Sequence, residues 1–397
     1  MLLPIVDVSQ TNSAAVAEDL SSTVRDLGRV GEVLLCDCDA AVLPAANDSI
    51  IQDLIRVSPC FVLGGIKDED QVRDLLRGGA HRVVLDSFAP MELLSRLPHH
   101  RVLVSIQCVD GVVVTNGRGR DLARAPVEAL QVLAPYCSGF LCTFSNSDGS
   151  SAKPDINLIK ELSQATSLYL AVRSDDFSLD EIQALDKLRV DVAARANQDF
   201  HVEGFAGCLN FDDGPIPTVV QDQHGQTLML GWSNYQTLKR SLLTGEAVYC
   251  SANGVDVESV GDYPFLGEQK HRLLRAAADY SRRSLVFRVT PYASPFERGR
   301  YSRYGKGDRD FSLSSLHDII LARQKDPHPG SYTSFLFERD DRIPRKLTEE
   351  LYELLTANTR NEIAWEAADV MYFLLAYLVK KGVSLDEVMS ELMGRER

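Results

Sequence analysis

The first 200 residues alternate short apolar runs with stretches of helical periodicity, and this alternation limits the folds open to them. The apolar runs are short enough to be strands and cover residues 5–8, 33–36, 60–63, 82–85, 102–105, 139–142, 167–170 and 190–192. Between them lie segments such as Asp70 to Arg77, whose residues Val72, Leu75 and Leu76 share one helix face. Strands that alternate with helices form parallel sheets, and eight strands favour a barrel over a doubly wound sheet. We therefore predict an α/β barrel-like domain over residues 1–200.

Length and charge narrow the class of protein. The chain has 397 residues, more than one hydrophobic core usually serves, so we expect several domains. Its formal net charge of −14 would repel nucleic-acid phosphates and anionic lipid, so we expect no nucleic-acid or membrane partner. The sequence shows no apolar run of about 20 residues and no signal peptide, which predicts a cytoplasmic protein. The eight cysteines, of which Cys250 is the last, are expected to be reduced.

The barrel region contains several short motifs, at residues 4–7, 35–40, 64–66, 79–80 and 110–111, at Thr143, and at residues 148–149. Together they resemble the phosphoribosyl-formimino isomerase barrel of histidine biosynthesis. That family uses one aspartate on the first strand and one on the fifth for acid–base catalysis. Asp7 matches the first, but Gln107, which cannot exchange a proton near neutral pH, stands in place of the second. Gly64 and Gly65 fit a phosphate site or a plain strand-to-helix turn, and we expect a barrel without catalysis.

Residues 200–217 are rich in Gly, Pro and Asp and are predicted to form a linker. The second predicted domain covers residues 215–305 and has an α+β pattern. Its predicted elements are a hairpin over 218–231, a helix over 234–244, and strands over 247–251 and 285–289.

Three segments of this domain, residues 220–222, 228–234 and 244–249, resemble the phosphoribosyl-AMP cyclohydrolase domain. The resemblance implies a thiolate-held zinc that activates a water to open a purine ring, and a magnesium site of three aspartates. The corresponding stretches here are residues 251–256, 279–283 and 296–303. They keep only Asp279 of the carboxylates and none of the expected cysteines, and they place Arg282 and Arg283 at the former metal site. Zinc is therefore not expected, and this domain is predicted to be only cyclohydrolase-like.

The basic residues of the same stretches have two interpretations. Arg298, Arg300 and Arg303 could hold the phosphates of a nucleotide directly, or they could be surface arginines of an acidic protein. We also expect Asp279 to be paired with Arg282 and Arg283 rather than free to bind a metal.

The third predicted domain, residues 312–397, has an all-α pattern. Helices are predicted over residues 314–325, 345–357, 361–381 and 385–393. Two of them carry apolar stripes that we expect to face the core: Leu347, Leu351, Leu354 and Leu355 in one, and Ile363, Ala367, Val370, Met371 and Leu374 in the other. Glu350 and Glu353 flank the first stripe, and Glu366 and Asp369 lie on the matching edge of the second.

These four carboxylates are therefore predicted to meet at the seam between the two helices. Like charges in close contact destabilise one another unless a cation compensates them. Oxygen-only ligands suit Mg²⁺ or Mn²⁺, and Mg²⁺ commonly joins carboxylates to substrate phosphates. We predict Glu350, Glu353, Glu366 and Asp369 as the catalytic and metal-binding residues. The alternative is a helical bundle in which these acids form ordinary surface salt bridges.

The spacing E-x-x-E, twelve residues, E-x-x-D is typical of the all-α nucleotide pyrophosphohydrolases. The flanking residues 323–325, 329–333, 346–353, 365–369 and 382–385 extend the similarity, and residues 312–397 resemble the phosphoribosyl-ATP pyrophosphohydrolase domain. The resemblance implies cleavage of the α/β phosphoanhydride of phosphoribosyl-ATP. The implied substrate-binding residues are Arg323, Lys325, Ser331, Tyr332, Thr333, Lys346 and Glu349.

The order of the three regions resembles the N-terminal half of the fungal multifunctional histidine-biosynthesis proteins, without the histidinol dehydrogenase part. We expect a Mg²⁺-dependent hydrolase of phosphoribosyl-ATP or a close analogue, with a small nucleotide as substrate. A homodimer through the cyclohydrolase-like or the helical domain is expected. Two alternatives stay open: a bifunctional enzyme that retains cyclohydrolase activity, and a non-catalytic nucleotide-binding or scaffold paralogue.

Overall fold

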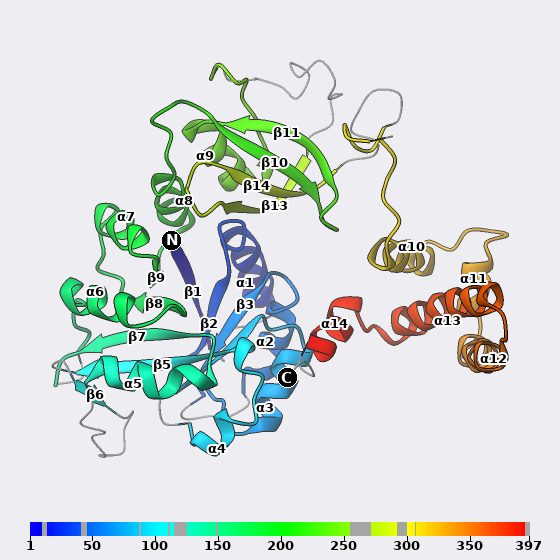
Figure 1. Ribbon diagram of the computed structural model, residues 1–397, viewed down its shortest axis with the longest axis horizontal. Helices are drawn as coiled ribbons and strands as arrows, with labels where there is room; N and C mark the ends of the chain where they lie inside the picture. The colour runs from blue at the N-terminus through cyan, green and yellow to red at the C-terminus, as the bar shows by residue number, and fades with distance from the viewer. Residues whose placement is uncertain are drawn as a thin grey trace. The chain divides into compact units, whose positions relative to one another are not determined.

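The computed structural model divides the chain into two compact units, Met1–Asp308 and Arg309–Glu396 (Figure 1). The residues described are 1–9, 14–40, 46–86, 89–109, 112–114, 125–147, 150–254, 271–291, 300–305 and 307–393. None of the helices in these ranges combines the length and hydrophobicity needed to cross a lipid bilayer.

The first unit begins with a closed parallel barrel. Its eight parallel strands are β1 (Leu2–Val8), β2 (Val33–Asp37), β3 (Cys60–Leu63), β4 (Arg82–Asp86), β5 (Val102–Val109), β7 (Gly139–Ser145), β8 (Tyr169–Arg173) and β9 (Val190–Ala194). They follow the order β4-β3-β2-β1-β9-β8-β7-β5, and a β4–β5 pairing closes the ring. β6 (Val112–Val114) adds an antiparallel hairpin to β5. The predicted eight-stranded barrel is therefore confirmed.

Helices surround these strands (Figure 1). They are α1 (Ala14–Leu27), α2 (Asp48–Leu54), α3 (Glu69–Arg77), α4 (Met91–Leu94), α5 (Pro126–Leu133), α6 (Ile156–Ala165), α7 (Leu179–Lys187) and α8 (Gln198–Gly207), with 3₁₀ turns at His99–Arg101 and Ala134–Tyr136. Side chains alternate along each strand, as β1 shows. Leu3 and Ile5 point into the barrel, whereas Val6 and Val8 pack against the helix layer. Apolar side chains thus pack on both faces of the strands, and this packing fixes the position of the polar groups at the carboxyl ends of the strands.

The predicted linker over residues 200–217 is wrong in its first part, because α8 continues to Gly207. The Asn197 side chain caps this helix by accepting a hydrogen bond from the Phe200 amide at 2.9 Å. A Cβ atom added at Gly204 would lie 2.1 Å from Leu2 Cδ1. Gly204 thus allows α8 to approach β1 closely and does not mark a break in the helix.

A five-stranded sheet completes the first unit. Its strands are β10 (Ile216–Asp222), β11 (Thr227–Ser233), β12 (Glu246–Ala247), β13 (His271–Ala278) and β14 (Leu285–Thr290), in the order β11-β10-β14-β13-β12, with α9 (Tyr235–Thr244) between β11 and β12. The predicted hairpin, helix and last strand are confirmed. β12 is shorter than predicted, and β13 is an additional strand that the sequence pattern did not indicate.

Ion pairs join this sheet to the barrel. Arg282 donates to Asp186 of α7 at 2.6 and 2.9 Å, and Arg275 of β13 donates to Glu32 at 2.7 Å. The barrel and the sheet therefore share one compact unit, although the sequence analysis divided them at residues 200–215.

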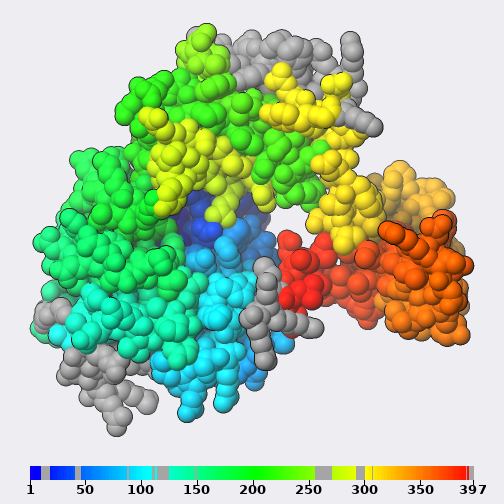
Figure 2. Space-filling model, in the orientation of Figure 1, coloured from blue at the N-terminus to red at the C-terminus, as the bar shows by residue number. Residues whose placement is uncertain are grey.

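The described part of the second unit, residues 309–393, contains five helices, coloured from dark yellow to red in Figures 1 and 2. They are α10 (Leu313–Lys325), α11 (Tyr332–Phe337), α12 (Arg342–Thr356), α13 (Arg360–Lys381) and α14 (Leu385–Met393). Four confirm predicted helices, and the short α11 is additional. Thr359 and Glu362 form a capping box at the start of α13, and Gly382 ends it with a φ of 69°.

Candidate functional site

The acidic seam lies between α12 and α13, which pack against each other. Carboxylate oxygens of Glu350, Glu353 and Glu366 all lie within 4.8 Å of one another. Asp369 is close enough for its charge to act on Glu366. The structure thus brings together the residues that the sequence assigned to one edge of each helix. We call these four residues the acidic seam.

The charges of the acidic seam are only partly balanced. Glu350 is buried, and its carboxylate lies 2.9 Å from the ammonium of Lys346, which is also 3.0 Å from Glu349. These two carboxylates raise the pKa of Lys346, so it stays charged. Among the described residues, no cation lies within ion-pair distance of Glu353 or Glu366. Burial and then the charge of Glu353 raise the pKa of Glu366 above its usual value.

The geometry of the acidic seam fits a small divalent cation. Mg²⁺ binds oxygens at about 2.1 Å, so opposite ligands lie about 4.2 Å apart. Oxygens within 4.8 Å of one another need only small side-chain movements to reach that spacing. All the donors are carboxylates, which suits Mg²⁺ or Mn²⁺ and does not favour a thiolate-seeking metal.

Replacing Glu353 with glutamine should leave the melting temperature of the metal-free protein unchanged or raise it. The change removes a charge that raises the pKa of Glu366. A carboxyl group whose pKa is raised by folding destabilises the folded state once it ionises. The metal-free wild-type protein should therefore lose stability as pH rises from the ordinary glutamate value of 4.5, and the variant should lose less.

If the acidic seam binds Mg²⁺, the metal should raise the melting temperature of the wild-type protein, and the same Glu353→Gln variant should lose this increase. Thermal melts with chelator and with Mg²⁺, recorded between about pH 4 and pH 8, measure both effects. A variant that melts lower without metal and keeps its Mg²⁺ response would show that these acids are structural.

Three of the predicted substrate-binding residues lie beside one part of α13. The Thr333 hydroxyl lies 2.8 Å from the hydroxyl of Tyr372, and the Tyr332 ring meets Phe373 edge-on at 6.4 Å. The ammonium of Lys346 lies 5.9 Å from the centre of the Phe373 ring. Tyr372 and Phe373 were missed by the sequence analysis. Their spacing of three and four residues from Asp369 places them on its helix face, which was a usable signal.

The remaining predicted substrate-binding residues are less closely tied to the acidic seam. Ser331 caps α11 by accepting a hydrogen bond from the Ser334 amide and, with Tyr332, lines a cavity of about 980 Å³. Arg323 and Lys325 lie in the last turn of α10. No contact within the described ranges joins either of these two cations to the acidic seam.

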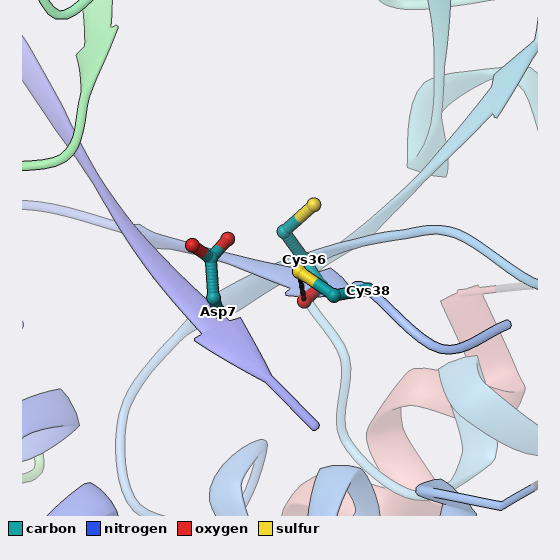
Figure 3. Close-up of side chains that lie close together, drawn as sticks. All are labelled: Asp7, Cys36 and Cys38. Carbon is teal, nitrogen blue, oxygen red and sulfur yellow. Dashed lines mark hydrogen bonds between the residues drawn. The ribbon is translucent and has the colours of Figure 1, made fainter. Parts of the chain in front are cut away.

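The carboxyl ends of the barrel strands hold a second group of polar side chains. Figure 3 shows Asp7 of β1 beside Cys36 and Cys38 at the end of β2, and their ligand atoms lie within 4.8 Å of one another. Arg195 donates to both carboxylate oxygens of Asp7, at 2.6 and 3.0 Å. Although burial raises the pKa of Asp7, these hydrogen bonds bring it below its usual value.

Asp7 is therefore held as a charged partner of Arg195 and is not poised to exchange a proton near neutral pH. Gln107 donates to the Ser145 hydroxyl at 3.2 Å and adds no titratable group. Burial, with Cys36 and Asp7, raises the pKa of Cys38 to about 12. With Asp7 in an ion pair and the pKa of the Cys38 thiol raised, these described side chains do not form an acid–base pair. The motif residues 110–111 and 148–149 lie outside the described residues.

The segment assigned to the former magnesium site is a tight turn between β13 and β14. The Asp279 carboxylate accepts hydrogen bonds from the amides of Ser281, Arg283 and Ser284. The expected pairing of Asp279 with two guanidinium groups is therefore wrong, because Arg282 binds Asp186 and Arg283 binds Asp213. The backbone amides of a tight turn lie nearer to the carboxylate than the ends of long side chains do, so they occupy its hydrogen-bonding positions.

The remaining candidates of the central region lie partly outside the described residues. Residues 255–270 and 292–299, which include Phe296 and Arg298, are among those not described. Arg300 and Arg303 are exposed, and Cys250 is buried in the described part of the sheet.

Two family models match the chain. One, described as histidine biosynthesis protein, matches residues 9–198, and the other, described as phosphoribosyl-ATP pyrophosphohydrolase, matches residues 313–396. The chain is 34% identical over 198 residues to the histidine biosynthesis bifunctional protein HisIE of Pyrococcus furiosus, covering 47% of this chain and 93% of that relative. The chain belongs to this family of histidine-biosynthesis proteins. The resemblances of the barrel and of the helical unit to histidine-biosynthesis domains are thus confirmed.

Fungal histidine-biosynthesis proteins are also similar to the chain. The histidine biosynthesis trifunctional protein of Neurospora crassa is 32% identical over 182 residues, 44% of this chain and 19% of the relative. That of Saccharomyces cerevisiae is 30% identical over 219 residues, 54% of this chain and 26% of the relative. The predicted likeness to multifunctional fungal proteins of this pathway is confirmed.

Proposed function

We propose that the helical unit hydrolyses phosphoribosyl-ATP, or a close nucleotide analogue, to phosphoribosyl-AMP and pyrophosphate with Mg²⁺ or Mn²⁺. The main support is the convergence of Glu350, Glu353 and Glu366 within 4.8 Å in a region that matches the phosphoribosyl-ATP pyrophosphohydrolase family. An acidic cluster with one lysine among four carboxylates needs further positive charge, which a metal–polyphosphate complex supplies.

In this proposal the carboxylates of the acidic seam would hold the metal, which when bound would supply positive charge to the polyphosphate and polarise the phosphorus that is attacked. Lys346 fixes the buried carboxylate of Glu350. Tyr332 and Thr333 position the substrate from the first turn of α11, where Thr333 bonds to Tyr372 and the Tyr332 ring contacts Phe373 of α13. Water forms the new P–O bond at one phosphate, the bridging P–O bond breaks, and the water proton goes to a seam carboxylate.

The proposal predicts metal-dependent release of pyrophosphate. Purified full-length protein incubated with phosphoribosyl-ATP and Mg²⁺ should form pyrophosphate and phosphoribosyl-AMP, and a chelator should stop both products. Chromatographic separation of the nucleotides and a pyrophosphate assay measure this. Undiminished hydrolysis in chelator would contradict the proposal, and tight nucleotide binding without any hydrolysis would support the scaffold alternative.

The bifunctional alternative rests on the relatives, because the name of the Pyrococcus furiosus protein describes it as bifunctional. It requires ring-opening chemistry in the central sheet. The described residues of that sheet do not favour it, because Asp279 is bound by its own turn.

An exposed apolar surface supports the homodimer. The sequence analysis expected the apolar stripes of α12 and α13 to face the core, but many of their side chains are exposed: Leu351, Leu355, Ile363, Met371 and Leu374. Leu355 is 76% exposed and Met371 is 48% exposed. Large exposed apolar patches mark interaction surfaces. We infer that a second copy of the chain packs on this surface.

Replacing Leu355 or Met371 with glutamate should then lower the molar mass in solution from that of a dimer to that of a monomer. A buried charge at such an interface is costly unless it is paired. Light scattering after gel filtration measures the mass. Val132→Glu, at an exposed apolar position of α5, is the matched control and should not change it. A dimer that survives both changes would place the interface elsewhere.

A further inference from the structure

A cavity of about 550 Å³ lies where the end of α1 approaches β13 and β14 in the first unit. The Ala276 amide of β13 donates to the Arg29 carbonyl, which fixes this approach. Five arginines line the cavity: Arg25, Arg29, Arg272, Arg275 and Arg288. We call it the arginine cavity. Such a concentration of positive charge is unexpected by chance in a chain with a net charge of −14.

The protein balances only part of this charge. Arg29 donates to Asp26 at 2.6 Å and to the Leu242 carbonyl at 3.0 Å, and Arg275 donates to Glu32. Within the described ranges, no carboxylate lies within ion-pair distance of Arg25, Arg272 or Arg288. Burial lowers the pKa of Arg29. The charge of Asp26 raises this pKa, and the charges of Arg272 and Arg25 lower it, so the guanidinium groups repel one another.

The sheet register adds a further unfavourable contact. Arg275 of β13 lies directly opposite Arg288 of β14. Like charges at directly opposed positions of antiparallel strands are destabilising. Glu32 compensates Arg275 alone, and an anion bound between the two guanidinium groups would compensate Arg288 as well.

The chemistry of the walls indicates the class of ligand. Arginine is the side chain best suited to phosphate because its planar guanidinium donates two parallel hydrogen bonds. The volume falls in the range of small-molecule sites. Pro59, Leu274 and Val286 add apolar surface beside the charges. Three arginines that have no carboxylate partner among the described residues suit more than one phosphate group.

We propose that the arginine cavity binds a small molecule carrying two or three linked phosphates, at a site distinct from the acidic seam. The site needs no metal, because the arginines themselves supply the positive charge. This proposal does not depend on the proposed hydrolysis. A ligand in the arginine cavity would be a nucleotide bound in addition to the substrate, with a regulatory effect.

Calorimetric titration of the full-length protein in chelator tests the site, since the acidic seam repels anions without metal. ATP, ADP, inorganic pyrophosphate and AMP are the probes. ATP and ADP should bind more tightly than AMP, and pyrophosphate binding would show that the phosphates alone suffice. Arg272→Ala and Arg288→Ala should each weaken ATP binding at least about tenfold, whereas Arg96→Ala, at an exposed position away from the cavity, should not.

Two further measurements distinguish binding in the arginine cavity from binding at the acidic seam and from a loss of folding. Glu350→Gln and Glu366→Gln should bind ATP in chelator as the wild-type protein does. Arg288→Ala should leave the melting temperature without ligand unchanged or raise it, because a like charge opposite Arg275 is removed. The proposal is overturned by the absence of saturable binding, by equal affinities in the wild-type and arginine variants, or by binding that is lost only in the Glu350→Gln and Glu366→Gln variants.

Discussion

Glu350→Gln and Glu366→Gln should each reduce pyrophosphate release from phosphoribosyl-ATP by about 10²-fold or more. Glutamine keeps the size of the side chain but removes the charge that would hold a metal or accept a proton, and general-base assistance alone is typically worth about 10² to 10⁴ in rate. Glu350 is the buried member of the acidic seam and lies 2.9 Å from Lys346, while Glu366 lies on the facing helix. Loss at both positions would show that both helices serve one site.

Steady-state kinetics at saturating Mg²⁺ measure the effect, with circular dichroism to check that each variant is folded. Asp318→Asn is a suitable control, because Asp318 is a partly exposed acid on α10 of the same unit and lies outside the acidic seam. Its turnover should stay near that of the wild-type protein. Unchanged turnover in folded Glu350→Gln and Glu366→Gln would reject the assignment of the site.

Phosphoribosyl-AMP should accumulate as the end product, with no ring-opened nucleotide at any zinc concentration. The segment expected to hold a metal is a hairpin turn in which Asp279 is bound by three backbone amides. Burial raises the pKa of Asp279, but these three hydrogen bonds and one from the Ser281 hydroxyl lower it to about 2. Arg282, with a φ of 60°, points to Asp186 and joins the sheet to the barrel. The turn thus serves the fold.

Mass spectrometry of the nucleotide products, with and without added zinc, tests this. Arg282→Ala should lower the melting temperature, because it leaves the buried Asp186 carboxylate without this partner, and it should not create a new product. Arg283→Ala is the matched control: its ion pair with Asp213 is exposed on both sides and should contribute little. A ring-opened product from the wild-type protein would establish the bifunctional alternative.

Local patterns in the sequence were sufficient for most of the elements near the candidate site. The strands of the barrel were found because each is a short apolar run, and α12 and α13 because their apolar residues recur at helical spacing. The edge positions of Glu350, Glu353 and Glu366 follow from the same periodicity. Capping residues such as Thr359 also act locally, since they bind amides within the next turn.

β13 and α8 show where a local pattern is misleading. A register shift between Leu273 and Arg275 interrupts the alternation of β13, so the segment does not look like a strand. Gly204 suggested a linker because glycine disfavours helices, but it is needed for the contact of α8 with Leu2. In both cases a neighbouring element decides the conformation, and that neighbour is distant in the chain.

The partners of the charged residues were decided only by the tertiary structure. Periodicity determines which face of a helix or strand a side chain occupies, because that depends on the local backbone. It does not determine what lies opposite that face. Arg195 neutralises Asp7 across 188 residues, and the arginine cavity is assembled from α1, β13 and β14. The sequence by itself determined the barrel, the helical unit and the helix edges that carry the four predicted acids, whereas chain packing decided which of the described charges have an oppositely charged partner.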